Sequence, residues 1–185
     1  SMLRKRGYFT ACIGKWHLGD LPEYDPQKSG YDHFWGLRSG GVDYFTYKNT
    51  HGERDLWDDE TPIDRTGYLT DLMGDRAVEM IEGFARQSVP FFLSLHFTAP
   101  HWPWEGPEDK AESDRLAATG KPNAIMHYDG GTMATYAKMV TRMDYQIGRV
   151  LAALKAAGMD EDTIVIFTSD NGGERFSDTW PFSGR

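Results

Sequence analysis

Apolar positions along the chain change repeatedly between helical spacing and continuous runs, and these changes predict the elements. Residues 68–84 carry apolar side chains at largely helical spacing, which predicts a helix. Residues 89–97 follow as an almost continuous apolar run, which predicts a buried strand. Residues 132–157 again show helical spacing and are stopped by Gly158, and residues 163–168 form the next apolar run.

Strands that are apolar on both faces and alternate with helices indicate an α/β fold, with a mostly parallel sheet covered by helices on both faces. Near the start, residues 3–7 resemble the last turn of a helix, and residues 8–13 predict a short strand. Residues 14–64 and 98–130 lack sustained periodicity and are predicted to be loops with short extended pieces. Ligands of such open sheets gather beyond the carboxyl ends of the strands.

Composition limits the class of protein and of partner. The 185 residues, 39% of them apolar, suit a single domain or part of a larger one. The 20 Lys and Arg against 28 Asp and Glu give a net charge of −8, which offers no basic surface for a nucleic-acid backbone. An anionic substrate would therefore have to be attracted by a local cluster of cationic groups.

The sequence carries little information on the compartment. The single Cys12 excludes an internal disulfide framework but leaves the compartment open. Residues 3–6 are basic, yet no apolar run follows them, so we expect these residues not to be part of a signal peptide. No stretch approaches the ~20 apolar residues that a membrane span needs.

Polar residues follow each predicted strand. Lys15 and His17 come after the first, where Lys15 could neutralise an oxyanion and His17 could move a proton. His101 follows the second strand, between two prolines that stiffen its backbone. Asp170 and Asn171 follow the third and offer the hard oxygen ligands that suit Ca²⁺ or Mg²⁺. Each feature alone also fits an ordinary structural role: an exposed lysine, a hydrogen-bonded loop histidine, or a turn that caps backbone groups.

Together, in this order and on this strand pattern, the three segments resemble the sulfatase family of the alkaline-phosphatase superfamily. The likeness extends from Gly7 to Gly173. The segments are residues 7–19, with the Gly-Lys-x-His motif at Lys15 and His17; residues 99–103, with Pro-His-x-Pro around His101; and residues 163–172, with the Asp-Asn pair at Asp170 and Asn171.

The resemblance implies a partial alkaline-phosphatase-like sandwich and a reaction. In that reaction a formylglycine hydrate, made from the Cys or Ser of a Cys/Ser-x-Pro-x-Arg motif, attacks sulfur beside one Ca²⁺, with Mg²⁺ as the alternative. Lys15 would bind sulfate and stabilise the hydrate, His17 would help to eliminate sulfate, and His101 would protonate or bind the leaving oxygen. Asp170 and Asn171 would be metal ligands.

Some parts of the family pattern are missing from the sequence. No Cys/Ser-x-Pro-x-Arg motif occurs, and Cys12 lies in a different context, so we interpret it as a buried strand cysteine and assign no nucleophile. In the family, that motif and an early Asp-Asp metal pair precede the Gly-Lys-x-His strand. A further sulfate-binding Lys follows the Asp-Asn turn, where this sequence ends with residues 182–185. We therefore interpret residues 1–185 as one fragment of a catalytic domain, truncated at both ends and inactive alone, with the formylglycine in the missing N-terminal segment.

The expected substrate of the parent is a sulfate ester of a carbohydrate or an aryl alcohol. Trp104 is a candidate substrate contact, because aromatic faces suit sugars and aryl groups. Missing strands would expose an unpaired sheet edge, which favours dimerisation or strand swapping, with a homodimer through that edge as the candidate assembly. The parent is expected to be periplasmic or secreted. Five further residues could line the pocket, but ordinary loop packing accounts for them better; they are Asp43, Tyr44, His51, Trp102 and Glu105.

Two alternatives remain open. One is a phosphonate- or phosphate-ester hydrolase of the same superfamily, in which an Asp-His pair is common where this chain has Asp170 and Asn171. The asparagine favours sulfate. The other is a non-catalytic binding module that kept the sheet and lost the nucleophile.

Overall fold

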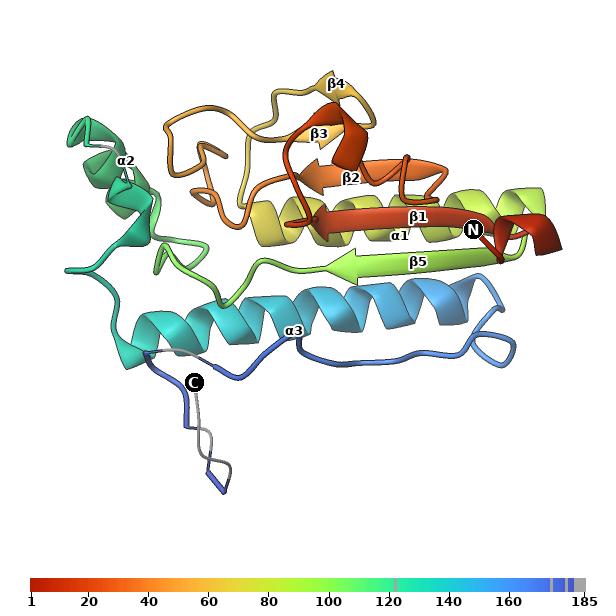
Figure 1. Cartoon of the computed structure of the whole chain (residues 1–185). Helices are drawn as coiled ribbons and strands as arrows, with labels where there is room; N and C mark the ends of the chain where they lie inside the picture. The colour runs from red at the N-terminus through yellow and green to blue at the C-terminus, as the bar shows by residue number, and fades with distance from the viewer. Residues whose placement is uncertain (122, 174, 179, 182–185) are drawn as a thin grey trace.

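A mixed five-stranded sheet forms the centre of the computed structural model (Figure 1), which describes residues 1–121, 123–173, 175–178 and 180–181. The strand order is β4-β3-β2-β1-β5. Strand β1 pairs in parallel with both β2 and β5, whereas β2-β3 and β3-β4 are antiparallel. The elements are η1 (Arg4–Arg6), β1 (Phe9–Lys15), η2 (Pro22–Tyr24), β2 (His33–Leu37), β3 (Trp57–Asp58), β4 (Thr61–Pro62), α1 (Leu69–Gln87), β5 (Phe91–His96), α2 (Lys110–Ala118), η3 (Ala124–Met126) and α3 (Met133–Ala156).

The predicted α/β class is confirmed, and both long helices lie where the apolar spacing predicted them. Helix α1 buries a stripe of side chains that recur every three or four residues against β1 and β5. Helix α3 begins after Thr132, whose hydroxyl accepts a hydrogen bond from the Thr135 N–H (3.0 Å). The buried stripe of α1 includes Leu69, Met73, Ala77, Ile81 and Phe84.

Polar side chains also join α1 to α3. Arg142 makes a two-pronged ion pair with Asp71 (2.5 and 2.8 Å), and Gln146 donates to the same carboxylate (2.7 Å). Gly74 faces Gln146 so closely that a Cβ at this position would lie 2.2 Å from its Oε1. The two helices therefore approach each other at a point where only glycine fits.

The strand predicted over residues 163–168 is wrong for this chain. The segment pairs with no strand among the described residues, and Figure 1 draws it outside the sheet. Ile164, Ile166 and Phe167 are 90%, 81% and 76% exposed. An apolar run becomes a strand only where a neighbour takes up its backbone hydrogen bonds, and no described strand lies beside this run.

Strand β5 is less buried than its apolar sequence suggested. It ends the described sheet, so β1 is its one strand neighbour, and the side chains of Phe92 and His96 are exposed.

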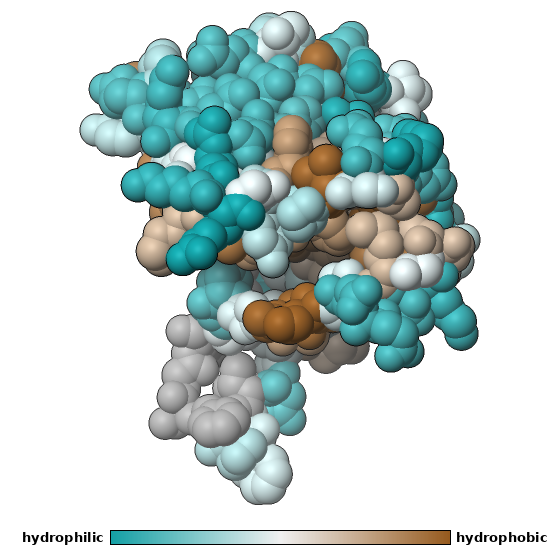
Figure 2. Space-filling view, turned by 90° about the vertical axis from the view of Figure 1, so that its right-hand side faces the viewer, coloured by the Kyte–Doolittle hydropathy of each residue, from teal (hydrophilic) through white to brown (hydrophobic). Residues whose placement is uncertain are grey.

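The surface at the end of the molecule seen in Figure 2 is mostly hydrophilic and carries separate apolar areas. In the described part of the chain, neither long helix has an apolar stretch sufficient to cross a bilayer.

The helix contact at Gly74 leads to a paired prediction. Gly148→Ala should stabilise the protein by about 0.5–1 kcal/mol, because alanine restricts the unfolded chain and its Cβ would meet nothing within 4 Å. Gly74→Ala should instead cost about 1–3 kcal/mol through overpacking against Gln146. Urea unfolding of both variants measures this difference. Equal stability of the two variants would contradict the close helix contact.

Candidate functional site

The candidate site begins where three parallel strands end. Gly14 lies near the end of β1 with φ 110°, and a Cβ there would be 2.0 Å from the His96 carbonyl oxygen of β5. A Cβ on Gly36 of β2 would be 2.0 Å from the Gly14 carbonyl oxygen. Glycine at both positions therefore permits the backbones of β2, β1 and β5 to approach, immediately before Lys15.

Lys15 and His17 leave this end of β1 in fixed backbone geometry. The imidazole Nδ1 of His96 donates to the Lys15 carbonyl oxygen (3.0 Å). His17 adopts a left-handed conformation (φ 56°), and its N–H donates to the Arg38 carbonyl oxygen (3.0 Å). The side chain of His96 is thus hydrogen-bonded, although it is exposed at the end of the edge strand.

Charges at this end of the sheet act on one another. Burial lowers the pKa of Lys15, and the negative charge of Asp170 opposes that shift. Burial and then the Lys15 charge lower the pKa of His17, whereas Asp20 and Asp170 raise it. His17 is therefore mostly neutral at pH 7, since its ordinary pKa of 6.5 is lowered further. Asp170 lies close enough to influence both residues.

His101 is held by its own loop. Its N–H donates to the Thr98 carbonyl oxygen (2.9 Å), and its carbonyl accepts from the Tyr44 hydroxyl (3.0 Å). The ring lies against Trp102, with 4.2 Å between ring centroids, and its Nδ1 lies 2.8 Å from the Trp102 carbonyl oxygen. A carbonyl only accepts, so Nδ1 carries a proton, and any acid-base role of the ring falls to Nε2.

The His17 and His101 rings lie against two consecutive residues. A Cβ on Gly40 would be 2.4 Å from His17 Nε2, and a Cβ on Gly41 would be 3.1 Å from His101 Cε1. Because consecutive Cα atoms are about 3.8 Å apart, these atoms of the two rings lie within about 12 Å of each other. The structure thus brings together two predicted site residues that are far apart in the sequence.

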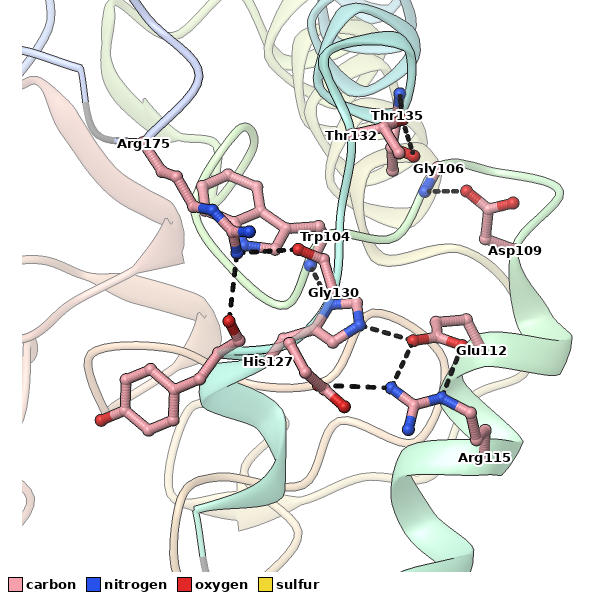
Figure 3. A network of polar contacts seen from close by, with 12 residues as sticks. Trp104, Gly106, Asp109, Glu112, Arg115, His127, Gly130, Thr132, Thr135 and Arg175 are labelled. Carbon is pink, nitrogen blue, oxygen red and sulfur yellow. Dashed lines mark hydrogen bonds and ion pairs between the residues drawn. The ribbon is translucent and has the colours of Figure 1, made fainter.

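A buried histidine anchors the loop that carries His101 (Figure 3). His127 is 2% exposed, and its Nδ1 accepts from the Trp104 N–H (3.0 Å). Its Nε2 therefore bears the proton and donates to Glu112 (2.5 Å), which also makes a two-pronged pair with Arg115 (2.7 and 2.8 Å). The loop is tied in this way to helix α2.

The segment after Asp170 and Asn171 contacts the same network. Arg175 donates to the Tyr128 and Gly130 carbonyl oxygens at 3.3 and 2.8 Å, as Figure 3 shows. The Phe176 ring lies edge-on to Trp104, with 5.0 Å between centroids. Trp104 itself is 4% exposed. It therefore packs two site segments together and has little surface left for a substrate.

A second buried acid supports the His101 loop from behind. Glu105 is fully buried, and its Oε2 accepts from the Tyr44 N–H (3.2 Å). Burial, with a further contribution from the negative charge of Asp43, raises the pKa of Glu105 to about 10. Asp43 accepts hydrogen bonds from the Thr46 N–H (2.6 Å) and the Ser113 hydroxyl (2.9 Å). Glu105 is therefore protonated at neutral pH, which fits the expectation of loop packing.

The exposed pair Asp170 and Asn171 offers a carboxylate and an amide oxygen on a bend. The Asn171 side-chain nitrogen donates to the Gly172 carbonyl (2.7 Å), which leaves its Oδ1 available as a ligand atom. This donor chemistry fits Ca²⁺ or Mg²⁺. Calcium takes 6–8 oxygen ligands, so water, substrate or other protein groups would have to supply the rest.

A different group of potential ligands lies at the other end of β2, where His33, Asp58 and Asp59 gather. His33 Nε2 lies 2.9 Å from Arg76 Nη2, and its Nδ1 lies 3.0 Å from Asp59. Arginine only donates, so Nε2 accepts and Nδ1 donates to the carboxylate. Both ring nitrogens are thus used, and a metal would have to displace the Arg76 guanidinium.

Cys12 is fully buried in β1, and burial raises the pKa of its thiol to about 12. A thiol that stays protonated is a poor nucleophile. The interpretation of Cys12 as a buried strand cysteine agrees with the structure.

Several residues that shape the site were not found from the sequence. Gly40 and Gly41 contact the two histidines, and His127 anchors the loop. Only the Gly-Gly pair carried a visible signal, because two consecutive glycines after an apolar stretch indicate a tight backbone approach.

Comparison with known proteins places this geometry in context. The profile of the family described as Sulfatase matches residues 1–184. N-acetylgalactosamine-6-sulfatase of Mus musculus is 33% identical, over 92% of this chain and 32% of its own length. Arylsulfatase of Klebsiella aerogenes is 27% identical, over 90% of this chain and 45% of its own length. The chain thus spans less than half the length of these curated relatives.

Solved structures share the fold. The crystal structure of Ps i-CgsB in complex with k-i-k-neocarrahexaose superposes with a TM-score of 0.77 and 28% identity, over 97% of this chain and 41% of that one. PsFucS1 sulfatase from Pseudoalteromonas sp. gives a TM-score of 0.64 and 27% identity, over 97% of this chain and 38% of that one.

The raised pKa of Glu105 predicts a specific pH dependence of stability. Unfolded Glu105 loses its proton above its ordinary pKa of 4.5, whereas the folded protein keeps it up to about pH 10. The folded state therefore binds more protons, and stability falls as the pH rises through this window, by at most about 1.4 kcal/mol per pH unit. Glu105→Gln should make the fall shallower, since the amide does not titrate.

Urea unfolding at pH 6 and pH 9 measures that slope. Glu108→Gln, at an exposed glutamate, is the matched control and should leave the slope unchanged. If the slope of Glu105→Gln equals that of the unaltered protein, Glu105 is ionised in the fold.

Proposed function

Because the chain belongs to the sulfatase family, we propose that its parent protein hydrolyses sulfate esters and that this chain supplies part of the catalytic site. The observation that carries the proposal is the contact of His17 and His101 with the adjacent residues Gly40 and Gly41. The negative charge of Asp170, which raises the pKa of both Lys15 and His17, supports including the third segment in the proposal.

The proposed roles follow from the chemistry of the groups. A sulfuryl centre carries negative charge on its oxygens, so the Lys15 ammonium would bind them and stabilise charge in the transition state. The basic Nε2 of His101 can take up a proton and then donate it to the leaving oxygen, while Nδ1 stays bonded to Trp102. His17, mostly neutral at pH 7, can accept a proton from a hydroxyl group of the nucleophile.

A metal is part of the proposal. Asp170 and Asn171 would hold Ca²⁺, with Mg²⁺ as the alternative, and the ion would offset negative charge on the sulfate oxygens. We also propose that the nucleophile is a formylglycine outside residues 1–185, since the one cysteine of this chain is buried and protonated. On this proposal, residues 1–185 are a single fragment of the catalytic domain, without turnover of their own.

The proposed substrate is a carbohydrate sulfate ester. Its support is the names of similar proteins, which include N-acetylgalactosamine-6-sulfatase and a neighbour solved with k-i-k-neocarrahexaose. Aryl sulfate esters are the other candidates, as the similar arylsulfatase suggests. Trp104 receives a packing role in the proposal because its ring is buried against Phe176 and Tyr136.

Sulfate-ester hydrolysis is tested in the full-length parent with a lysine pair. Lys15→Ala should lower kcat on a sulfate ester by about 10²–10³-fold, the usual effect of removing one group that stabilises transition-state charge. Lys28→Ala is the control, because Lys28 is exposed and makes only a long contact with Glu60 (3.8 Å). Equal activity of the two variants would refute the role of Lys15.

The same assay separates the alternatives. Turnover of a phosphodiester in preference to a sulfate ester would favour the phosphate-ester hydrolase, and a parent inactive on both would favour a binding module. Residues 1–185 alone, given a sulfate ester and Ca²⁺, should show no turnover. Turnover that disappears with Lys15→Ala would contradict the fragment proposal.

A homodimer through the sheet edge is a separate proposal. The edge of β5 that faces away from β1 has no partner strand among the described residues. In the segment that follows α3, the apolar side chains of Ile164 and Phe167 are also exposed. Such an edge is a template for strand pairing. Light scattering of the 185-residue chain should give the mass of a dimer, and a monodisperse monomer would contradict it.

A further inference from the structure

A short turn after β2 is built as a rigid support. The carboxylate of Asp55 accepts the N–H groups of Arg38 (3.0 Å) and Ser39 (2.8 Å). The Arg38 guanidinium pairs with buried Asp25 and lies 3.8 Å from the centroid of the Trp57 ring. The backbone of the turn is thus bonded to buried charged groups that have little freedom to move.

The residues that follow, Gly40 and Gly41, contact the two histidines. Gly40 has the closer contact, since a Cβ there would lie 2.4 Å from Nε2 and 2.7 Å from Cε1 of His17. At Gly41 the corresponding distances are 3.1 Å to Cε1 and 3.2 Å to Nδ1 of His101. His17 also donates its own N–H to Arg38 in the same turn (3.0 Å).

We propose that Gly40 and Gly41 are positioning residues, and that the turn anchored by Asp55 fixes where the His17 and His101 rings stand relative to each other. The missing side chain at Gly40 makes room for the His17 ring, and Gly41 does the same for His101. Any effect of this ring placement on catalysis rests on the proposed function. The position itself does not.

Gly40→Ala isolates the contact from the backbone. The φ angle of Gly40 lies outside the left-handed region, so alanine fits the backbone without strain. The three atoms nearest to the new Cβ all belong to the His17 ring, which is exposed on the surface and can swing outward. The variant should therefore keep its fold while the His17 ring moves.

Gly41→Ala should act more weakly and on the other histidine. Contacts of 3.1–3.2 Å require a shift of a few tenths of an ångström, and the bond from Nδ1 to the Trp102 carbonyl opposes rotation of the ring. The two variants thus predict separate effects on two assigned side chains.

The experiment uses the isotope-labelled 185-residue chain and NMR of the histidine rings. In the unaltered protein, the His17 ring protons should show a nuclear Overhauser contact with the Gly40 Hα protons. In Gly40→Ala the ring signals of His17 should move and those of His101 should stay. Gly148→Ala, in open space on α3, is the control and should change neither ring.

Two results would overturn the proposal. One is a folded Gly40→Ala variant whose His17 ring signals are unchanged. The other is the absence of the Overhauser contact in the unaltered chain, a measurement that stands even if the variant does not fold.

Kinetics of the full-length parent then show what the position contributes. Gly40→Ala should lower kcat by about 10- to 100-fold, since misplacement of a reacting group by about 1 Å has effects of that size. A parent without sulfate-ester turnover refutes the proposed function while the NMR result still decides the positioning. A shifted His17 with unchanged kcat would refute the catalytic value of the position alone.

Discussion

The close approach of three backbones at the end of β1 is the constraint on which the candidate site depends. Gly14 lies between the His96 carbonyl of β5 and Gly36 of β2, at distances that exclude any Cβ. If this approach opened, the ladders on both sides of β1 would separate at the point where Lys15 begins. The Gly-Lys-x-His motif thus combines a structural requirement at its glycine with the polar groups that follow.

Periodicity predicted the parts of the fold that bury a long apolar stripe. Helices α1 and α3 and strand β1 belong to this class. Strand β2 was missed because five consecutive buried residues that include Gly36 do not form a recognisable pattern in a loop-rich region. Helix α2 was missed because its surface is mostly charged and it buries only Ser113 and Leu116.

Apolar runs are also ambiguous about their partners. The run over residues 163–168 carried the same signal as a buried strand, yet its side chains are exposed in this structure. The sequence alone indicates that burial of such a segment would be energetically favourable, but it does not identify the element that would cover it. The site residues show the same limit, because His17 and His101 follow strands in the sequence, whereas their contacts with Gly40 and Gly41 exist only in three dimensions.

Three segments of the site are held by groups that differ in kind. His17 is bonded to the turn anchored by Asp55, and the His101 loop is bonded to His127. The segment after Asp170 packs through Phe176 against Trp104, which His127 also holds. Loops that follow parallel strands make few backbone hydrogen bonds of their own. Buried side chains must therefore fix these loops in place of the sheet. The same chain can thus be acidic overall, at −8, and still gather a lysine and two histidines at one end of its sheet.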